Sequence, residues 1–192
     1  MKKICIINGH PSKDSYNYAL AESYKSGASQ ANASVNVIHI GSLDFNPNLG
    51  LGYKKRNKPL EPDLLEAIEK IKNADHLVWF FPMWWYGYPA IMKGFIDRAF
   101  LPNIAFRYTG KPFPEQLFKG KTARIIVTAD SPAWYTKWIM RNPAINQLKY
   151  GTLRFCGIKP VKVSYIGPMK NSKSEFKNAW LNKVNQLGLE TK

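Results

Sequence analysis

The chain alternates short apolar runs with longer amphipathic segments five times along its length. The apolar runs are rich in β-branched and aromatic residues, and those at residues 3–8 and 123–128 are typical of buried strands, whereas residues 35–40 alternate imperfectly between apolar and polar positions. They predict strands at residues 3–8, 35–40, 76–81, 123–128 and 160–166. Apolar residues at helical spacing predict helices at residues 15–33, 62–71, 89–100, 133–153 and 174–187, the fourth interrupted near Pro143.

Strands that alternate with helices in this way predict an α/β protein with a doubly wound parallel sheet. Right-handed crossovers leave few arrangements of five strands, and the flavodoxin-like order 2-1-3-4-5 suits the pattern best. Because no linker, low-complexity tract or internal repeat interrupts the alternation, we expect residues 1–192 to form a single domain. In a sheet of this order, ligands bind where the first and third strands end.

The most informative loop follows the third predicted strand. Pro82 ends the apolar run, and large side chains follow it at Met83, Trp84, Trp85, Tyr86 and, after Gly87, at Tyr88. Burial in the core would explain the aromatic residues before Pro82, but it explains poorly those that flank a glycine, where chains normally reach the surface. The loop therefore predicts a flat apolar surface for a planar ring system, with a dimer surface as the alternative.

A second candidate is the loop after the first strand, at residues 8–17. Free backbone N–H groups at the start of the following helix, together with His10, Ser12 and Ser15, would form a cradle for a phosphate group. Capping of the helix by Asp14 or Ser15 accounts for the same residues equally well. The loop lacks both the G-x-G-x-x-G and the Walker pattern, which disfavours Rossmann-type dinucleotide binding and P-loop chemistry.

A third loop, at residues 127–135, lies where the fourth strand is expected to end. Thr128, Ser131 and nearby backbone amides would reach the polar edge of a ring bound at the same side of the sheet. A turn capped by Asp130 or Ser131, with Pro132 opening a helix, is equally compatible, and both interpretations can hold together.

The charge balance is strongly basic, with 28 Lys and Arg against 13 Asp and Glu and a formal net charge of +15. These charges are dispersed, and the densest cluster is at residues 54–58. Without a zinc-finger spacing, an RNP-like motif or a basic helix, we expect a solvated basic surface that attracts phosphate-bearing cofactors, and no nucleic-acid partner.

The remaining chemistry is sparse. Cys5 and Cys156 stand in apolar surroundings without a CxxC motif, which predicts two buried free thiols and a reducing, cytoplasmic location. No HExxH motif, Cys/His cluster or nucleophile elbow is present, so we expect neither a metal site nor nucleophilic hydrolysis. No apolar run reaches the roughly 20 residues that a membrane span needs.

With these loops in place, the chain resembles the NAD(P)H:quinone oxidoreductase family of flavodoxin-fold flavoproteins, the DT-diaphorase-like group. The specific block is residues 81–100, and residues 10–17, 45–47, 131–135 and 155–158 support it. The resemblance implies a tightly bound flavin and a homodimer with active sites at the subunit interface. The pattern at residues 10–17 favours FAD as the flavin, with FMN as the alternative. It also implies ping-pong hydride transfer, in which NAD(P)H reduces the flavin and a quinone or similar small acceptor then takes its place.

The resemblance also assigns residues. The phosphate and nucleotide part of the cofactor would be held by His10, Ser15, Tyr16, Asn17 and Ala19. The isoalloxazine ring would lie against Pro82, Met83, Trp84, Trp85 and Tyr86. Its far edge would meet Thr128, Ala129, Asp130 and Ser131. Tyr135 and Arg141 match positions near the flavin carbonyl and N1, where the family has a tyrosine and a histidine.

Two departures from the family pattern stand out. The Thr-Thr-Gly-Gly turn of many members is replaced by an acidic stretch at residues 128–131, and the family histidine by Arg141. An arginine near N1 would stabilise a reduced, anionic ring electrostatically. The basic residues 54–58 favour NADPH over NADH. The alternative function is a regulatory or interaction subunit of the same fold that binds flavin and acts on a partner protein.

Overall fold

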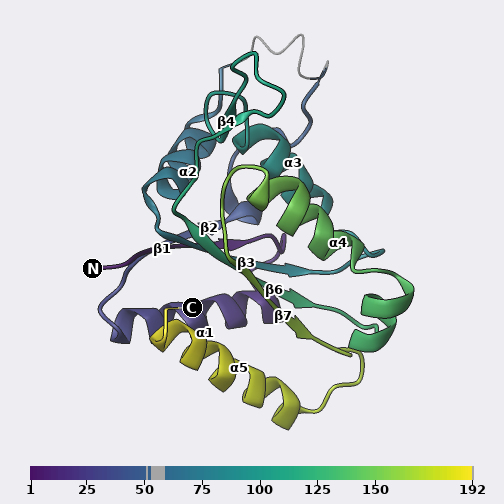
Figure 1. The fold of residues 1–192 in the computed structure, drawn as a ribbon. Coiled ribbons are helices and arrows are strands. Elements are labelled where there is room, and N and C mark those ends of the chain that lie inside the picture. Colours follow the sequence, from purple (N-terminus) through teal and green to yellow (C-terminus); the bar gives the residue numbers. More distant parts are fainter. Residues whose placement is uncertain (51, 53–58, 192) are drawn as a thin grey trace.

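The chain forms a five-stranded parallel sheet in the order β2-β1-β3-β6-β7, drawn in Figure 1. The structure is a computed structural model that describes residues 1–50, 52 and 59–191. The strands are β1 (Lys3–Asn8), β2 (Ser34–His39), β3 (His76–Pro82), β6 (Thr122–Thr128) and β7 (Val161–Ile166). The predicted order 2-1-3-4-5 is confirmed, and each predicted strand lies within a residue or two of its expected position.

Helices cover both faces of this sheet (Figure 1). One face carries α1 (Tyr16–Gln30) and α5 (Ser174–Leu189), and the other carries α2 (Pro62–Asn73), α3 (Ala90–Ala99) and α4 (Pro143–Asn146). A doubly wound sheet of this kind brings the loops that follow its parallel strands to one edge.

The fourth predicted helix, at residues 133–153, is divided into three short pieces. Two are π-helical, η3 (Tyr135–Ile139) and η4 (Gln147–Arg154), and α4 lies between them. Arg141 and Asn142 have left-handed φ angles of 57° and 51°, and Pro143 then opens α4. The expected interruption near Pro143 is present because proline is accepted in the first turn of a new helix but not inside one.

The sequence patterns missed two small elements. A two-stranded antiparallel ribbon is formed by β4 (Phe106–Arg107) and β5 (Glu115–Gln116), and a 3-10 turn, η1 (Ile40–Ser42), follows β2. Strands of two residues are too short to show any period in the sequence. The basic residues 54–58 lie outside the described residues.

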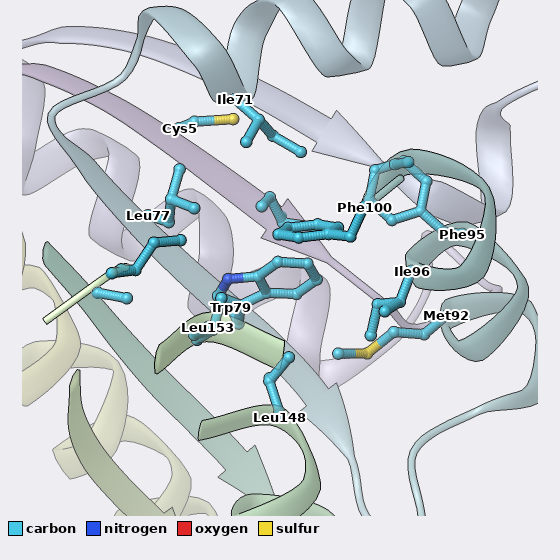
Figure 2. Packing of buried hydrophobic residues seen from close by; sticks show 14 of the residues in the cluster. Cys5, Ile71, Leu77, Trp79, Met92, Phe95, Ile96, Phe100, Leu148 and Leu153 are labelled. Carbon is cyan, nitrogen blue, oxygen red and sulfur yellow. The ribbon is translucent and has the colours of Figure 1, made fainter. Parts of the chain in front are cut away.

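The core has two layers because alternate residues of each strand face opposite sides of the sheet. In β3, Val78 and Phe80 pack toward α1 and α5, whereas Leu77, Trp79 and Phe81 pack toward the other helices. Figure 2 shows Trp79 surrounded by side chains from α3 and η4. Burying each apolar side chain of this size stabilises the fold by roughly 1.5–3 kcal/mol.

The expected state of the two cysteines is confirmed. Cys5 and Cys156 are buried and free. Burial raises the pKa of each thiol to about 12, so both stay protonated at neutral pH and behave as small apolar side chains. Among the helices that the structure describes, none is long and apolar enough to cross a membrane.

Candidate functional site

The loops after β1, β3 and β6 meet at the carboxyl edge of the sheet and enclose two adjoining pockets. The first pocket, of about 320 Å³, is lined by His10, Asp14, Ser15, Tyr16, Asn17, Pro82, Met83, Trp84, Thr128, Ala129, Asp130 and Met169. The second pocket, of about 480 Å³, is lined by Met83, Trp84, Trp85, Tyr86, Ala129, Asp130 and Ser131. Because four residues line both pockets, one elongated ligand could occupy the two together.

The polar end of the first pocket is the start of α1. Ser15 caps this helix, since its Oγ accepts a hydrogen bond from the Tyr18 amide at 3.2 Å and donates one to the Ser12 carbonyl at 2.9 Å. The amides of Tyr16 and Asn17 belong to the first helical turn, where no intrahelical acceptor exists. Neither amide has a hydrogen bond to a residue that the structure describes. The Ser15 cap therefore leaves these two first-turn amides facing the first pocket without a described partner.

His10 connects the first loop to the aromatic loop. Its backbone amide donates to the Asn8 Oδ1 at 3.1 Å, and its Nδ1 accepts from the Ser12 amide at 3.0 Å. Its ring meets the Trp84 indole edge-on, with the ring centroids 5.5 Å apart. These contacts fix the orientation of the imidazole at the wall of the first pocket, beside a tryptophan that lines both pockets.

A buried pair of polar side chains forms the floor of the first pocket. Asn17 and Thr128 are only 4% and 5% exposed, and the Asn17 Nδ2 donates to the Thr128 Oγ1 at 2.8 Å. The Asn17 Oδ1 has no hydrogen-bond partner in the part of the chain that the structure describes. An unpaired buried acceptor destabilises a fold, so its presence in a pocket favours a ligand that donates or carries a bound water.

The aromatic loop is a tight turn at Trp84–Gly87. The amides and carbonyls of Trp84 and Gly87 bond each other reciprocally at 2.9 and 2.8 Å. Trp85 and Tyr86 between them have left-handed φ angles of 49° and 58°, which makes a type I′ turn without the usual Gly or Asn. The Met83 amide donates to the Thr128 carbonyl at 2.7 Å, so the turn is tied to the end of β6.

The third loop approaches the same turn from the other side. The Tyr86 hydroxyl and the Ser131 Oγ share a hydrogen bond of 3.1 Å, and both residues line the second pocket. The ring of Tyr135, in η3, lies beside Tyr86 with a centroid distance of 6.5 Å. The second pocket is thus a slot with an aromatic wall and a polar wall, which is the arrangement that a planar ring with hydrogen-bonding edges requires.

A model of the flavodoxin-like fold family matches residues 2–187 of this sequence. The chain belongs to the flavodoxin-like fold family. Curated relatives include NAD(P)H dehydrogenase [quinone] 1 of Cavia porcellus, which is 28% identical in an alignment of length 184 that covers 83% of this chain and 66% of that protein. Ribosyldihydronicotinamide dehydrogenase [quinone] of Mus musculus is 30% identical in an alignment of length 183 that covers 82% of this chain and 78% of that protein. The predicted resemblance to quinone dehydrogenases is confirmed as distant homology.

Solved structures agree with this family membership. Smu.1420 from Streptococcus mutans UA159 superposes with a TM-score of 0.86 at 29% identity, covering 99% of this chain and 100% of that one. The NAD(P)H:quinone oxidoreductase from Methanothermobacter marburgensis has a TM-score of 0.84 at 22% identity, with 98% of both chains covered, and shows the shared fold. The first of the curated relatives is longer, since the match spans 66% of it.

Most of the residues predicted for the site in this flavodoxin-family chain line one of the two pockets. Ser12 of the predicted phosphate cradle is exposed and lines neither pocket, and Tyr88 of the aromatic loop is buried in the core. Of the residues that the resemblance assigns, three line neither pocket. Ala19 is exposed on α1, one turn beyond Ser15. Tyr135 contacts Tyr86 beside the second pocket without lining it, and Arg141 is exposed beyond η3 and lines neither pocket.

Sequence reasoning missed one wall of the site. Met169 follows β7 and lines the first pocket, and its amide donates to the Ala129 carbonyl at 2.9 Å. The sequence signal for Met169 was its position after the fifth predicted strand, because that strand also ends at this edge of a parallel sheet. Asp14 also lines the first pocket, although the sequence suggested only a capping role for it.

The electrostatics of the pockets are unusual for a phosphate site. The ionisable side chains that line them include His10, Asp14 and Asp130, and no lysine or arginine is among the described lining residues. An anion here would be held by first-turn amides and hydroxyls, aided by the positive field of a chain with a net charge of +15. Within residues 1–50, 52 and 59–191, no group of three or more acidic, His or Cys side chains could hold a metal ion.

Proposed function

We propose that the protein is a flavin-dependent NAD(P)H oxidoreductase that reduces quinones or similar small acceptors. The observation that carries the proposal is the continuity of a polar pocket at the start of α1 with a slot beside an aromatic turn. A ligand with a phosphate at one end and a planar ring at the other matches both halves. The distant homology to quinone dehydrogenases supports the same conclusion.

The residues fit such a cofactor by their chemistry. The first-turn amides of α1, with His10 and the Asn17–Thr128 pair, would hold the phosphate and polyol part, and the unpaired Asn17 Oδ1 would accept from it. The turn at Trp84–Gly87 would hold one side of the ring, and residues 128–131 would meet its polar edge. When bound, a flavin supplies reversible two-electron transfer between a nicotinamide and an acceptor, and the protein supplies orientation and electrostatics.

Tyr135 is the better placed of the two predicted catalytic residues. Its ring lies 6.5 Å from Tyr86, which lines the slot, whereas Arg141 is exposed and lines neither pocket. We propose that the Tyr135 phenol holds a proton near the ring edge. A role for Arg141 would require it to act on another chain or after a change at its left-handed backbone.

We propose FAD as the cofactor and FMN as the alternative. A solved FMN-dependent NADH-azoreductase from Bacillus anthracis, in complex with FMN, shares the fold with a TM-score of 0.75 at 16% identity. The preference for FAD rests on residues 10–17, and the preference for NADPH rests on residues 54–58. The buried free thiols support a cytoplasmic location.

The deciding experiment is to purify the protein, release any bound cofactor and measure its absorbance and mass. We expect a flavin, and we expect flavin-loaded protein to oxidise NAD(P)H in the presence of menadione. Protein that carries no flavin and takes up neither FAD nor FMN would contradict the proposal. Flavin binding without menadione turnover would favour the alternative, a regulatory subunit that acts on a partner protein.

We also propose that the protein is a homodimer. Large apolar side chains are exposed on the described surface, among them Tyr108 at 71% and Phe113 at 84%. Tyr108 and Phe155 also line a further pocket of about 360 Å³ beside α3 and η4. An exposed aromatic surface of this kind favours a protein interface, and a second copy of the chain is the partner that the family resemblance implies.

A further inference from the structure

A chain of hydrogen bonds connects the aromatic turn to β7, the outer strand of the sheet. The Tyr86 hydroxyl bonds the Ser131 Oγ at 3.1 Å, and the Ser131 carbonyl accepts from the Tyr165 hydroxyl at 2.6 Å. The Thr136 Oγ1 lies 2.9 Å from the same Tyr165 oxygen. Because Tyr165 donates its single proton to a carbonyl, Thr136 must be the donor in that last bond.

The Tyr165 hydroxyl is suited to a permanent donor role. Burial raises the pKa of Tyr165, the hydrogen bond from Thr136 opposes that rise, and the neighbouring Tyr86 and Asp130 add to it. The net effect is a raised pKa, so the phenol keeps its proton at neutral pH. Thr136 is fully buried at the other end of the bond.

The backbone of the third loop is also fixed against β7. A Cβ atom on Gly167 would lie 2.7 Å from the Ala129 carbonyl oxygen and 3.1 Å from that of Ser131. Only a glycine therefore allows the loop to approach this closely. Together with the hydrogen bond from the Met169 amide to the Ala129 carbonyl, this contact packs residues 167–169, directly after β7, against the polar wall.

The aromatic wall needs such a support. Trp85 and Tyr86 are both held in the left-handed region without a glycine, and Trp85 is fully exposed, so burial of its side chain does not stabilise the turn. Strained backbone of this kind persists where the surroundings hold it in place. Tyr86 is the residue of the turn whose side chain is hydrogen-bonded to the opposite wall.

We propose that Tyr165 is a positioning residue, which acts through Ser131 and Tyr86 to set the spacing and orientation of the two walls of the second pocket. The inference rests on the proposed function, because it takes the flavin ring as the occupant of that pocket. Tyr165 lies on β7 and lines neither pocket, so its effect on the ring is indirect. The group that it positions is the turn that would lie against the ring.

The experiment compares Tyr165→Phe with the wild type in flavin-free protein titrated with FAD. The phenylalanine keeps the ring and removes only the hydroxyl. We expect the Kd for FAD to rise about threefold to tenfold, as the loss of one hydrogen bond implies. We also expect a weaker circular dichroism signal from the bound flavin, which reports its orientation, and faster hydrogen exchange in the turn at residues 84–87.

Further variants separate positioning from simple loss of stability. Tyr86→Phe and Tyr165→Phe should be non-additive in Kd, because both interrupt one chain of bonds. Thr136→Ser keeps the hydroxyl that donates to Tyr165, so its Kd for FAD should resemble that of the wild type. Thr136→Val removes this donor, so its Kd should rise as in Tyr165→Phe, and it tests the same chain of bonds if Tyr165→Phe folds poorly. The matched control is Tyr150→Phe, which removes the hydroxyl of an exposed tyrosine in η4.

The outcomes distinguish this inference from the proposed function. If the wild type binds flavin and Tyr165→Phe has the same Kd, circular dichroism and hydrogen exchange as the wild type, the positioning role alone is overturned. Additive effects of Tyr86→Phe and Tyr165→Phe would also overturn it. A wild type that binds no flavin would remove the proposed function and this inference with it.

Discussion

At the scale of single residues, Trp85 combines a strained backbone with a fully exposed side chain. A left-handed conformation disfavours a residue with a Cβ by about 1–2 kcal/mol, and burial of the indole does nothing to offset it. Such a residue destabilises the free protein, which is the expected pattern where a site is preorganised for a ligand.

We predict that Trp85→Asn raises the free energy of unfolding of flavin-free protein by about 1 kcal/mol, because asparagine tolerates the left-handed region and suits the first position of a type I′ turn. The matched variant Trp85→Val should lower it, since a β-branched residue is the least tolerant there. Both should weaken flavin binding. Urea unfolding measures the stability and flavin titration measures the binding. Equal free energies of unfolding for the Asn and Val variants would contradict the claim that the backbone at Trp85 is strained.

Sequence reasoning at this scale located residue types better than orientations. Of the aromatic residues predicted to line a ligand site after Pro82, Trp84, Trp85 and Tyr86 line the second pocket. The prediction was wrong for Tyr88, which is buried in the core against Phe81. Ala19 lies on an exposed part of α1, and Arg141 lies beyond a left-handed stretch that no residue pattern reveals. The direction in which a side chain points from a helix or after a turn depends on backbone geometry, and a family resemblance alone does not supply that geometry.

At the scale of elements, the position of the site depends on how α1 is held against α5. A Cβ atom on Gly27 would lie 2.0 Å from the Asn185 carbonyl oxygen, and one on Gly188 would lie 2.2 Å from that of Tyr24. The Tyr16 hydroxyl donates to the Lys177 carbonyl at 2.7 Å, close to the cap of α1. The two helices therefore approach through glycines, and α5 supports the end of α1 that forms the first pocket.

We predict that Gly27→Ala destabilises the protein by about 1–3 kcal/mol, since the added methyl group meets backbone that cannot move freely. The control is Gly151→Ala in η4, where a Cβ would meet nothing within 4 Å. That variant should be neutral or slightly stabilising, because alanine loses less chain entropy than glycine on folding. Thermal unfolding of both variants checks the prediction, and an equal loss in both would contradict the close helix contact.

The contact between α1 and the end of β2 should make stability depend on pH. His39 stacks on Tyr18 with a centroid distance of 4.5 Å, and burial lowers the pKa of His39 below its ordinary value of 6.5, with Glu22 opposing the shift. Since the pKa is lower in the folded state, the unfolded chain takes up the proton first as pH falls. The stabilising effect is complete above about pH 6.5 and is lost as pH falls toward the folded-state pKa.

We therefore predict that the wild type loses stability between about pH 7 and pH 5 more steeply than His39→Gln, which has no titrating group at this position. Urea unfolding at several pH values measures both curves. The pH-dependent part of the difference between the proteins should grow toward low pH and vanish at the upper end of the range. Parallel curves across this range would show that His39 titrates alike in the folded and unfolded states.

The elements themselves show what sequence patterns can resolve. The buried strands were predicted well because a short apolar run bounded by turn residues, as at residues 76–81, is compatible with few structures besides a buried strand. The π-helical character of η3 and η4 was not predicted from the sequence. The apolar spacing at residues 133–153 does not distinguish hydrogen bonds between residues five apart from those between residues four apart. The wall at Met169 was missed because Gly167 and Pro168 signal only a turn.

At the scale of the whole molecule, the net charge of +15 and the exposed aromatic surface act together. Two copies of a strongly basic chain repel each other, so a dimer must bury enough apolar surface to overcome that repulsion. Stable interfaces of this kind bury on the order of 1,200–2,000 Å². The exposed rings of Tyr108 and Phe113 offer apolar surface of the kind that such an interface needs, and Tyr108 also lines the pocket beside α3 and η4.

We predict that the protein sediments at twice its chain mass of 21.9 kDa, and more completely at higher salt, where the repulsion is screened. Tyr108→Lys should shift it to the monomer, because it replaces an exposed ring with another positive charge. The matched control is Leu65→Lys on α2, which adds the same charge at a side chain that is 50% exposed and should leave the dimer intact. If the site is shared between subunits, as the family resemblance implies, Tyr108→Lys should lose menadione turnover together with the dimer. A wild type that remains a monomer at all salt concentrations would contradict this assembly.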